Sequence, residues 1–502
     1  MSVLQETQQL KPTRISIEQA AGESFVVRAI RFASSVRVGV AMLIALAAAC
    51  MAGMLVMQQN VDGFAAYFAT LTPAQKLVYG QLNLFDVYHS WWFNALLAAL
   101  SLNIILSTID RFPKVWRYYS KPSGTVPTRW LRDQPHSASF AVSGETDAIV
   151  DRVTSAMKAQ GYRSTKVNEK NGRKFIFAES GKWNRLMFIP VHIGLLMIFA
   201  GGFMTAHLGN TGNLPLAPGQ SSDLIYDTAF QLDKVQEVTK QLPFEVTFTD
   251  IQQKLIRDDG SLSPANTIDW MTWFKIKDET GEHDAFVQMN RPFDYRGYRF
   301  FQSSFTPIGR ARTITIAAAP ANGGEPQTVS IPRNGSAELA DGTKLIFKEF
   351  RGTYSPGRED LSQDTGGYEN PAAIVEVVPR EGVMQQAVVF GPEAGDIPIA
   401  KKAVNGYTFK LTAFEKVGES HVLSVQRDPG ANVVYGGFAL LTLTLVGTFA
   451  FSHRRMWAAI EMGPQSTHEV ILAGNTNRNP NGFQEKFLSL KSSIVDSMKE
   501  SN

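Results

Sequence analysis

The chain has 502 residues, with 49 Lys and Arg against 46 Asp and Glu, and a formal net charge of +3. This near balance lacks the basic excess of a nucleic-acid-binding protein, so we expect no nucleic-acid partner. The single cysteine, Cys50, excludes an internal disulfide, a CxxC redox pair and a CxxCH haem-attachment site. Cys50 lies in an apolar stretch and is expected to pack as a small hydrophobic residue.

Four apolar stretches are each long enough to cross a bilayer, which takes roughly 20 residues. They span residues 38–57, 91–109, 186–206 and 433–451. No small-residue cleavage site is obvious after the first, so a signal anchor is expected there. The stretches divide the chain into an N-terminal segment (1–37), a loop (58–90), a middle segment (110–185), a large segment (207–432) and a tail (452–502).

Basic residues near the ends of the four stretches predict their orientation. They are Arg28, Arg31, Arg37, Arg111, Lys114, Arg117, Lys121, Lys182, Arg185, Arg454 and Arg455, whereas the loop 58–90 has only Lys76. The positive-inside rule places residues 1–37, 110–185 and 452–502 in the cytoplasm. The loop and the large segment 207–432 are expected outside.

The middle segment 110–185 reads as a compact α+β unit. "SASFAV" (137–142) is typical of a strand, and Ile149, Val153 and Met157 share one face of a helix. The Asn-Gly pair at 171–172 predicts a hairpin, which completes a β-α-β-β unit. In the polar tail, we expect "NTNRNPNG" (475–482) to be disordered and residues 483–499 to form a short amphipathic helix.

The large segment alternates apolar and polar residues, as half-buried strands do. The alternation recurs at 243–251, 268–278, 311–319, 343–350, 372–378 and 407–414. This predicts a β-sandwich or barrel-like domain. An aromatic run, Tyr295, Tyr298, Phe300, Phe301 and Phe305, has two interpretations: core residues of alternating strands, or an exposed docking surface. The fold class is thus a four-helix membrane protein with a large extracytoplasmic β-rich domain and a small cytoplasmic α+β segment.

No Walker loop, zinc motif or GxSxG motif occurs, so no catalytic site is predicted. The histidines are the candidate ligand residues, because the imidazole ring is a versatile ligand. His192 lies inside the third span, where an ionisable group is costly and usually functional. A ligand or relay role and a simple hydrogen bond between helices both stay open. His89 and His207 fall near the outer ends of spans two and three, as interfacial residues or a paired site. We expect surface positions for His136, His283 and His468, an interfacial one for His453 and a structural one for His421.

Residues around His192 suggest local flexibility and access. Pro190 is expected to loosen the helix, because it lacks a backbone donor and clashes with the preceding turn. Gly194, Gly201 and Gly202 would allow another group to approach the helix closely.

Four stretches, in order, resemble the ResB family of system II cytochrome c biogenesis. They are "FDVYHSWWFNALLAALSLNIILSTIDRFP" (85–113), "HIGLLMIFAGG" (192–202), "MNRPFDYRGYRFFQSSF" (289–305), and "RDPG" (427–430) followed by "YGGFALLTLTLVGTFAFSHRR" (435–455). The four-span layout with a large outer insert also matches, so the resemblance covers most of residues 30–457.

The resemblance implies a subunit that works with a CcsA/ResC-type membrane protein to move haem outward and attach it to the CxxCH cysteines of apocytochrome c. The tryptophan-rich haem-handling motif is absent here, since Trp91 and Trp92 are followed by Phe93 at a span edge. The partner would supply that motif, and a thioredoxin-like reductant would act indirectly. The chain would then be a non-autonomous component of a haem-ligation complex in the bacterial inner membrane, with its large domain in the periplasm.

The family's intramembrane haem-ligating histidine falls at His192, which implies an axial ligand to the iron of haem b in transit. The second ligand would come from the partner. The alternative function is a haem-independent membrane scaffold that holds partner proteins through its outer domain. A solute transporter is disfavoured, because four spans with few buried polar residues make a poor path.

Overall fold

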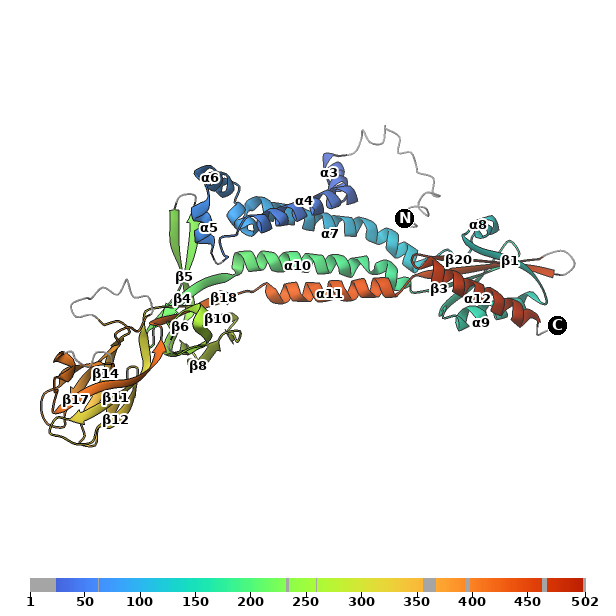
Figure 1. Cartoon of the computed structure of the whole chain (residues 1–502). Coiled ribbons are helices and arrows are strands. Elements are labelled where there is room, and N and C mark those ends of the chain that lie inside the picture. Colours follow the sequence, from blue (N-terminus) through green and yellow to red (C-terminus); the bar gives the residue numbers. More distant parts are fainter. Residues whose placement is uncertain are drawn as a thin grey trace. The chain divides into compact units, whose positions relative to one another are not determined.

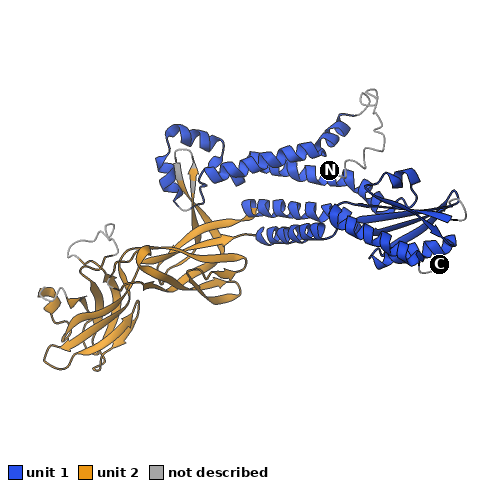
Figure 2. Cartoon of the chain, turned by 45° about the vertical axis from the view of Figure 1, so that its right-hand side comes forward, with its two compact units in different colours: residues 1–207, 430–502 blue, residues 208–429 orange. Residues whose placement is uncertain are grey.

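The computed structural model describes residues 24–61, 63–231, 234–258, 260–354, 367–392, 398–462 and 467–499. The chain divides into two compact units, drawn in different colours in Figure 2. Unit 1 comprises residues 1–207 and 430–502, and unit 2 comprises residues 208–429. Unit 1 contains the long apolar helices and an α/β domain, and unit 2 is built from strands.

The described residues include four helices long and apolar enough to cross a membrane, one at each of the four predicted spans. They are α4 (Val36–Leu55), α7 (Trp91–Ser120), α10 (Phe188–Leu208) and α11 (Ala431–Ala450) (Figure 1). Helix α7 continues well past Ile109, where the predicted span ended at the first charged residue. A helix has no need to end there, because its backbone hydrogen bonds are internal on both sides of a membrane boundary.

Helices α4 and α7 pack together through a polar side chain inside the second span. Asn103 on α7 is buried and donates hydrogen bonds to the carbonyl oxygens of Ala33 and Ser35. These carbonyls lie at the break between α3 (Phe25–Ala33) and α4, where helix ends leave acceptors unsatisfied. The connection from α4 to α7 consists of α5 (Phe64–Thr70), α6 (Pro73–Gln81) and the 3-10 helix η1 (Leu84–His89).

Helices α10 and α11 approach through glycines at matching seven-residue spacings. A Cβ atom on Gly194 would lie 3.0 Å from the carbonyl oxygen of Gly437, and one on Gly201 would lie 2.9 Å from that of Gly430. Gly202 faces open space. The close approach that the sequence predicted along the third span therefore occurs at Gly194 and Gly201, where the approaching group is α11. Small residues permit such close helix packing in membranes.

The α/β domain of unit 1 is an antiparallel five-stranded sheet in the order β1-β20-β19-β3-β2. Its elements are α8 (Thr128–Arg132), β1 (His136–Ser143), α9 (Thr146–Ala159), β2 (Ser164–Lys170), β3 (Arg173–Ser180), β19 (Arg454–Met462), β20 (Thr467–Thr476) and α12 (Pro480–Lys499), with the 3-10 helix η2 (Lys182–Leu186) before α10. All four elements of the predicted β-α-β-β unit are present. The prediction that they form a complete unit is wrong, because β1 pairs with β20 from the tail.

The hairpin between β2 and β3 confirms its sequence signal. Asn171 and Gly172 both have positive φ, as the two-residue turn requires. Helices α9 and α12 cover one face of the sheet, and their apolar residues form a core with Ile176 and Met456. Trp130, Leu131 and Trp457 pack on the other face. Both faces of the sheet are therefore buried against other elements of the domain.

The expected disorder at 475–482 is wrong. Thr476 ends β20, and the side chain of Asn477 donates to Asn184 Oδ1 at 2.6 Å. Pro480 begins α12, where a missing backbone donor costs nothing. The predicted helix at 483–499 is confirmed, and Phe483, Phe487, Leu490 and Ile494 form its buried face. The polar composition of residues 475–482 did not predict an ordered segment, because the groups that satisfy its polar side chains lie elsewhere in the chain.

Unit 2 is the predicted β-rich domain. Its strands are β4 (Asn210–Leu216), β5 (Ser221–Gln231), β6 (Lys234–Leu255), β7 (Thr267–Asp278), β8 (Gly281–Gln288), β9 (Phe293–Tyr295), β10 (Tyr298–Thr306), β11 (Arg310–Pro320), β12 (Gln327–Pro332), β13 (Ser336–Glu338), β14 (Lys344–Arg351), β15 (Ala372–Val378), β16 (Gln385–Phe390), β17 (Tyr407–Val417) and β18 (Ser420–Arg427). Short 3-10 turns lie at η3 (Pro264–Asn266) and η5 (Pro398–Lys401).

Two β substructures make up unit 2. The first is an eight-stranded sheet in the order β8-β7-β6-β5-β4-β18-β10-β9. It curls around its own core, since β8 and β10 come into contact although they lie near opposite ends of the order. The second is a sandwich of the sheets β12-β11-β17 and β13-β14-β15-β16, which share one core. The predicted barrel-like and sandwich forms therefore both occur.

Candidate functional site

His192 lies on the second turn of α10, where its ring meets that of Phe188 edge-on at a centroid distance of 5.8 Å. The side chain is partly buried. Helix α10 begins at Phe188, so Pro190 lies in its first turn and not in its interior. A proline there removes no interior hydrogen bond, so the loosening that the sequence suggested does not occur. His192 is thus held on a regular helix.

Thr108 of α7 fixes the orientation of the His192 ring. Its hydroxyl oxygen lies 2.6 Å from Nδ1 of His192 and 2.6 Å from the carbonyl oxygen of Ile104. The hydroxyl has one hydrogen, and the carbonyl can only accept, so the hydroxyl donates to Ile104. The hydrogen-bond network therefore assigns the proton on the ring to Nδ1, which donates to Thr108.

This assignment leaves Nε2 of His192 with its lone pair. Within the described residues no hydrogen-bond partner of Nε2 is present. A neutral imidazole whose far nitrogen donates to an oxygen is the arrangement that metal-ligating histidines show. The described residues contain no group of three or more His, Cys, Asp and Glu side chains that could hold a metal ion.

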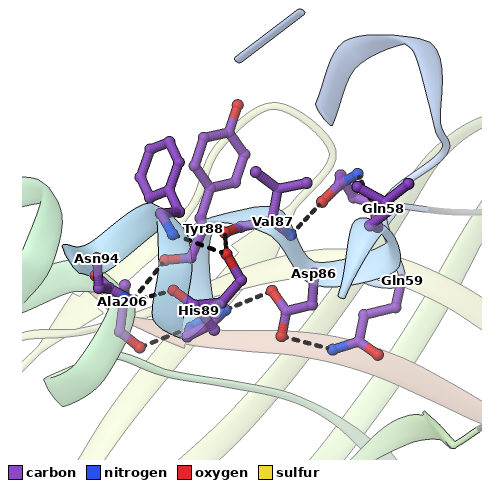
Figure 3. Close-up of polar contacts among 11 residues, drawn as sticks. Gln58, Gln59, Asp86, Val87, Tyr88, His89, Asn94 and Ala206 are labelled. Carbon is purple, nitrogen blue, oxygen red and sulfur yellow. Dashed lines mark hydrogen bonds and ion pairs between the residues drawn. The ribbon is translucent and has the colours of Figure 1, made fainter. Parts of the chain in front are cut away.

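The structure brings together His89 and His207, with ring centroids 6.0 Å apart. Figure 3 shows the contacts of His89. Its Nδ1 lies 2.5 Å from a carboxylate oxygen of Asp86, and its Nε2 lies 2.7 Å from the carbonyl oxygen of Ala206. Gln59 donates to the other carboxylate oxygen of Asp86 at 2.9 Å. Both ring nitrogens of His89 are therefore engaged, which favours the interfacial interpretation: His89 ties η1 to the end of α10.

A buried charged cluster joins the helices to the α/β domain. Arg185 donates to Nδ1 of His453 at 3.2 Å. Nε2 of His453 lies 3.4 Å from a carboxylate oxygen of Glu179 and 3.4 Å from Nε of Arg455. The guanidinium of Arg455 stacks on the ring of Tyr118 at 3.5 Å. Burial lowers the pKa of His453. Burial would raise the pKa of Glu179, but its hydrogen bond to His453 and the charge of Arg455 hold that pKa below its usual value.

The remaining histidines divide between structural and exposed positions. His421 is fully buried and bonds to Thr272, as expected of a structural residue. His453 and His468 are buried, and the ring of His136 packs on that of Phe483 at 5.0 Å. The expected interfacial position of His453 and surface positions of His136 and His468 are therefore wrong. All three lie in or beside the sheet whose central strands come from the tail. His283 lies on β8 with 41% of its side chain accessible, as expected of a surface residue.

The aromatic run of unit 2 lies in strands β9 and β10. Tyr298 and Phe300 are buried in the core of the curled sheet, with Tyr295 packed against that core. Phe301 alternates to the other face. Beyond the register shift between Gln302 and Ser304, Phe305 pairs with His421 and meets Trp270 at a centroid distance of 5.5 Å. The core interpretation is the one that the structure supports for Tyr298 and Phe300.

The model of the ResB-like family matches residues 36–488. This chain belongs to the ResB-like family. Among its curated relatives, the cytochrome c biogenesis protein CcsB of Gloeobacter violaceus is 25% identical, with 92% of this chain and 90% of the relative covered. The CcsB proteins of Thermosynechococcus vestitus and a Synechococcus species are 24% and 25% identical and are covered over 95% and 98% of their length. The resemblance to the ResB family is confirmed.

The extent of the ResB-like match bears on the α/β domain. Residues 36–488 include all four long helices, unit 2, both tail strands and the start of α12. The match to the family therefore includes the two tail strands that complete the sheet. The sequence did not lead to Thr108 as a site residue, although its hydroxyl lies inside the predicted apolar span 91–109. Its pairing with His192 depends on how α7 and α10 pack, which no local pattern gives.

Proposed function

We propose that this chain is a membrane subunit of a system II cytochrome c synthetase and that His192 ligates haem within the membrane. A CcsA/ResC-type partner would provide the second ligand and the tryptophan-rich motif. The two proteins together would pass haem outward and attach it to the CxxCH cysteines of apocytochrome c, kept reduced by a thioredoxin-like protein. The names of the curated relatives support the biogenesis role.

The observation that carries the haem role is the contact between Thr108 and His192. Haem is the cargo here, and its iron takes a nitrogen lone pair as an axial ligand. The chain presents such a lone pair at Nε2, because Nδ1 donates to Thr108. Phe188 beside the ring and the apolar helix around it keep water away and suit a flat hydrophobic ligand.

The proposed orientation places the α/β domain in the cytoplasm and unit 2 in the periplasm of a bacterial cell, following the basic residues at the span ends. Cysteine labelling in intact cells tests it. In a Cys50→Ser background, a cysteine at Val383 should react with an impermeant thiol reagent added from outside, and one at Met462 should not. Both side chains are largely exposed. The reverse pattern would refute the orientation.

Substitution of His192 tests the haem site. We expect His192→Ala to assemble with its partner but to lose the Soret band of the purified complex and cytochrome c assembly. Added imidazole should restore part of both by filling the vacated coordination position. His207→Ala, at the other end of the same helix, is the matched control and should keep its haem. Normal haem content in His192→Ala would make His192 a packing residue.

The alternative function, a haem-independent scaffold, makes the opposite prediction for the unsubstituted complex. A scaffold would show no Soret band that depends on this chain, while deletion of unit 2 would still abolish partner binding. Expression of the chain alone with a reporter apocytochrome should yield no holocytochrome under the haem proposal. Covalent haem attachment without the partner would contradict the non-autonomous role.

A further inference from the structure

One face of α7 runs from His192 to the charged cluster beside the α/β domain. Thr108 and Arg111 are three residues apart, and Arg111 and Tyr118 are seven apart, so all three share a face of the helix. Thr108 contacts His192, and the guanidinium of Arg185 lies 4.9 Å from the ring centroid of Tyr118. Arg111 therefore lies between these two contacts, about 4.5 Å along the helix axis from Thr108.

The guanidinium of Arg111 is available to bind a ligand. The side chain is exposed, and within the part of the chain that the structure describes it has no hydrogen bond or ion pair. The neighbouring Asp110 pairs instead with Lys114, at 3.2 Å. Arg111 is near enough for its positive charge to act on the ring of His192. An accessible cation thus lies beside the proposed iron ligand.

We propose that Arg111 binds a propionate carboxylate of the haem whose iron is held by His192. This inference rests on the proposed function. Haem carries its two carboxylates on one edge, and a guanidinium binds a carboxylate with two parallel hydrogen bonds. Arg111 lies toward the C-terminal end of α7, so the carboxylate edge faces the α/β domain and the apolar edge faces the opposite end of the helices.

Arg185, which also lies on this side of His192, is already engaged in other contacts. It donates to His453 and lies over the ring of Tyr118. Moving it toward a ligand would leave Nδ1 of the buried His453 without its donor, which costs free energy. Arg111 can bind the carboxylate with no such loss. It would thereby select a porphyrin with free carboxylates and fix which edge enters first.

A comparison of two probes tests the role of Arg111. The full chain with its co-expressed partner, stripped of haem, is titrated with iron protoporphyrin IX and with its dimethyl ester, and binding is followed at the Soret band. We expect the unsubstituted complex to bind haem about tenfold more tightly than the ester, the loss of one charge-assisted contact. Arg111→Gln should lose about tenfold in haem affinity and bind both probes alike. Arg111→Lys should keep part of the preference.

Arg117→Gln is the matched control, because it removes the same charge from another face of the same helix. It should bind both probes as the unsubstituted complex does. An equal loss in Arg117→Gln, or an unchanged haem-to-ester ratio in Arg111→Gln, would overturn the proposal and assign Arg111 to lipid phosphates. If Arg111→Gln does not accumulate, equal affinity of the unsubstituted complex for the two probes overturns it. No Soret band with either probe would instead overturn the haem role of His192.

Discussion

The α/β domain and unit 2 are both built on antiparallel sheets, but the chain assembles them differently. Unit 2 uses one continuous stretch, residues 208–429. The α/β domain combines residues 128–180 with residues 454–499, and the late strands β19 and β20 lie between β1 and β3. Its sheet therefore forms only after α10, unit 2 and α11 have been synthesised. Closing so long a loop costs entropy, which packing on both faces of the sheet must offset.

The largest expected effect comes from cutting the two regions apart. Residues 208–429 produced alone should fold, because their cores contain no residue from unit 1. A fragment of residues 110–185 should stay unfolded, because it lacks the two central strands. Near-ultraviolet circular dichroism and limited proteolysis of both fragments measure this. A cooperative unfolding transition in the fragment 110–185 would show that its β-α-β-β segment folds without the tail.

A core substitution in each region should destabilise that region alone. Trp457 is 3% exposed, and its ring packs on those of Trp130 and Phe177 at centroid distances of 5.3 and 5.5 Å. Trp457→Ala should cost the α/β domain about 3–5 kcal/mol of unfolding free energy, and Phe350→Ala should cost unit 2 a similar amount. Hydrogen exchange resolved by peptide separates the two. Loss of protection in unit 2 of Trp457→Ala would contradict the independence of the regions.

Acid should weaken both regions, and in unit 2 the effect has an identifiable source. Burial lowers the pKa of His421 to about 3, while the unfolded chain titrates near 6.5. Between these values the unfolded state binds more protons, so unit 2 loses stability as the pH falls below 6.5. At pH 5 the loss is about 2 kcal/mol.

Denaturant unfolding of unit 2 at pH 7.5 and pH 5 measures this loss. His421→Gln should be less stable at pH 7.5 but should lack this part of the pH dependence. An unchanged pH dependence in the variant would place the acid sensitivity at other groups. In the α/β domain burial also lowers the pKa of His453, so its stability should fall in the same direction.

The smallest expected effect concerns a contact that, like the sheet of the α/β domain, joins distant segments. Thr108→Val keeps the shape of the side chain but removes the acceptor for Nδ1 of His192. The haem affinity of the complex should fall about tenfold, as when an outer-shell partner of a metal ligand is lost. Thr108→Ser should retain the affinity. Soret titrations of both variants check this, and equal affinities would show that the hydroxyl does not orient the ring.

Sequence patterns predicted most elements because their causes are local. Apolar runs of about 20 residues predicted α4, α7, α10 and α11, and alternation predicted β6, β7, β11, β14, β15 and β17. The Asn-Gly turn at 171–172 was predicted for the same reason, since few residues accept positive φ. The candidate site was predicted only in part: His192 was identified by a titratable ring inside an apolar span.

Local patterns were thus enough to predict the four long apolar helices, many of the strands and the position of one unusual histidine, because each depends on residues close together in the chain. The tertiary structure alone decided that β1 pairs with β20, that the polar tail is ordered, and that Thr108 meets His192. These outcomes depend on partners hundreds of residues away or on another helix. The free energy that selects them comes from the burial and hydrogen bonding of the pair, which neither segment shows alone.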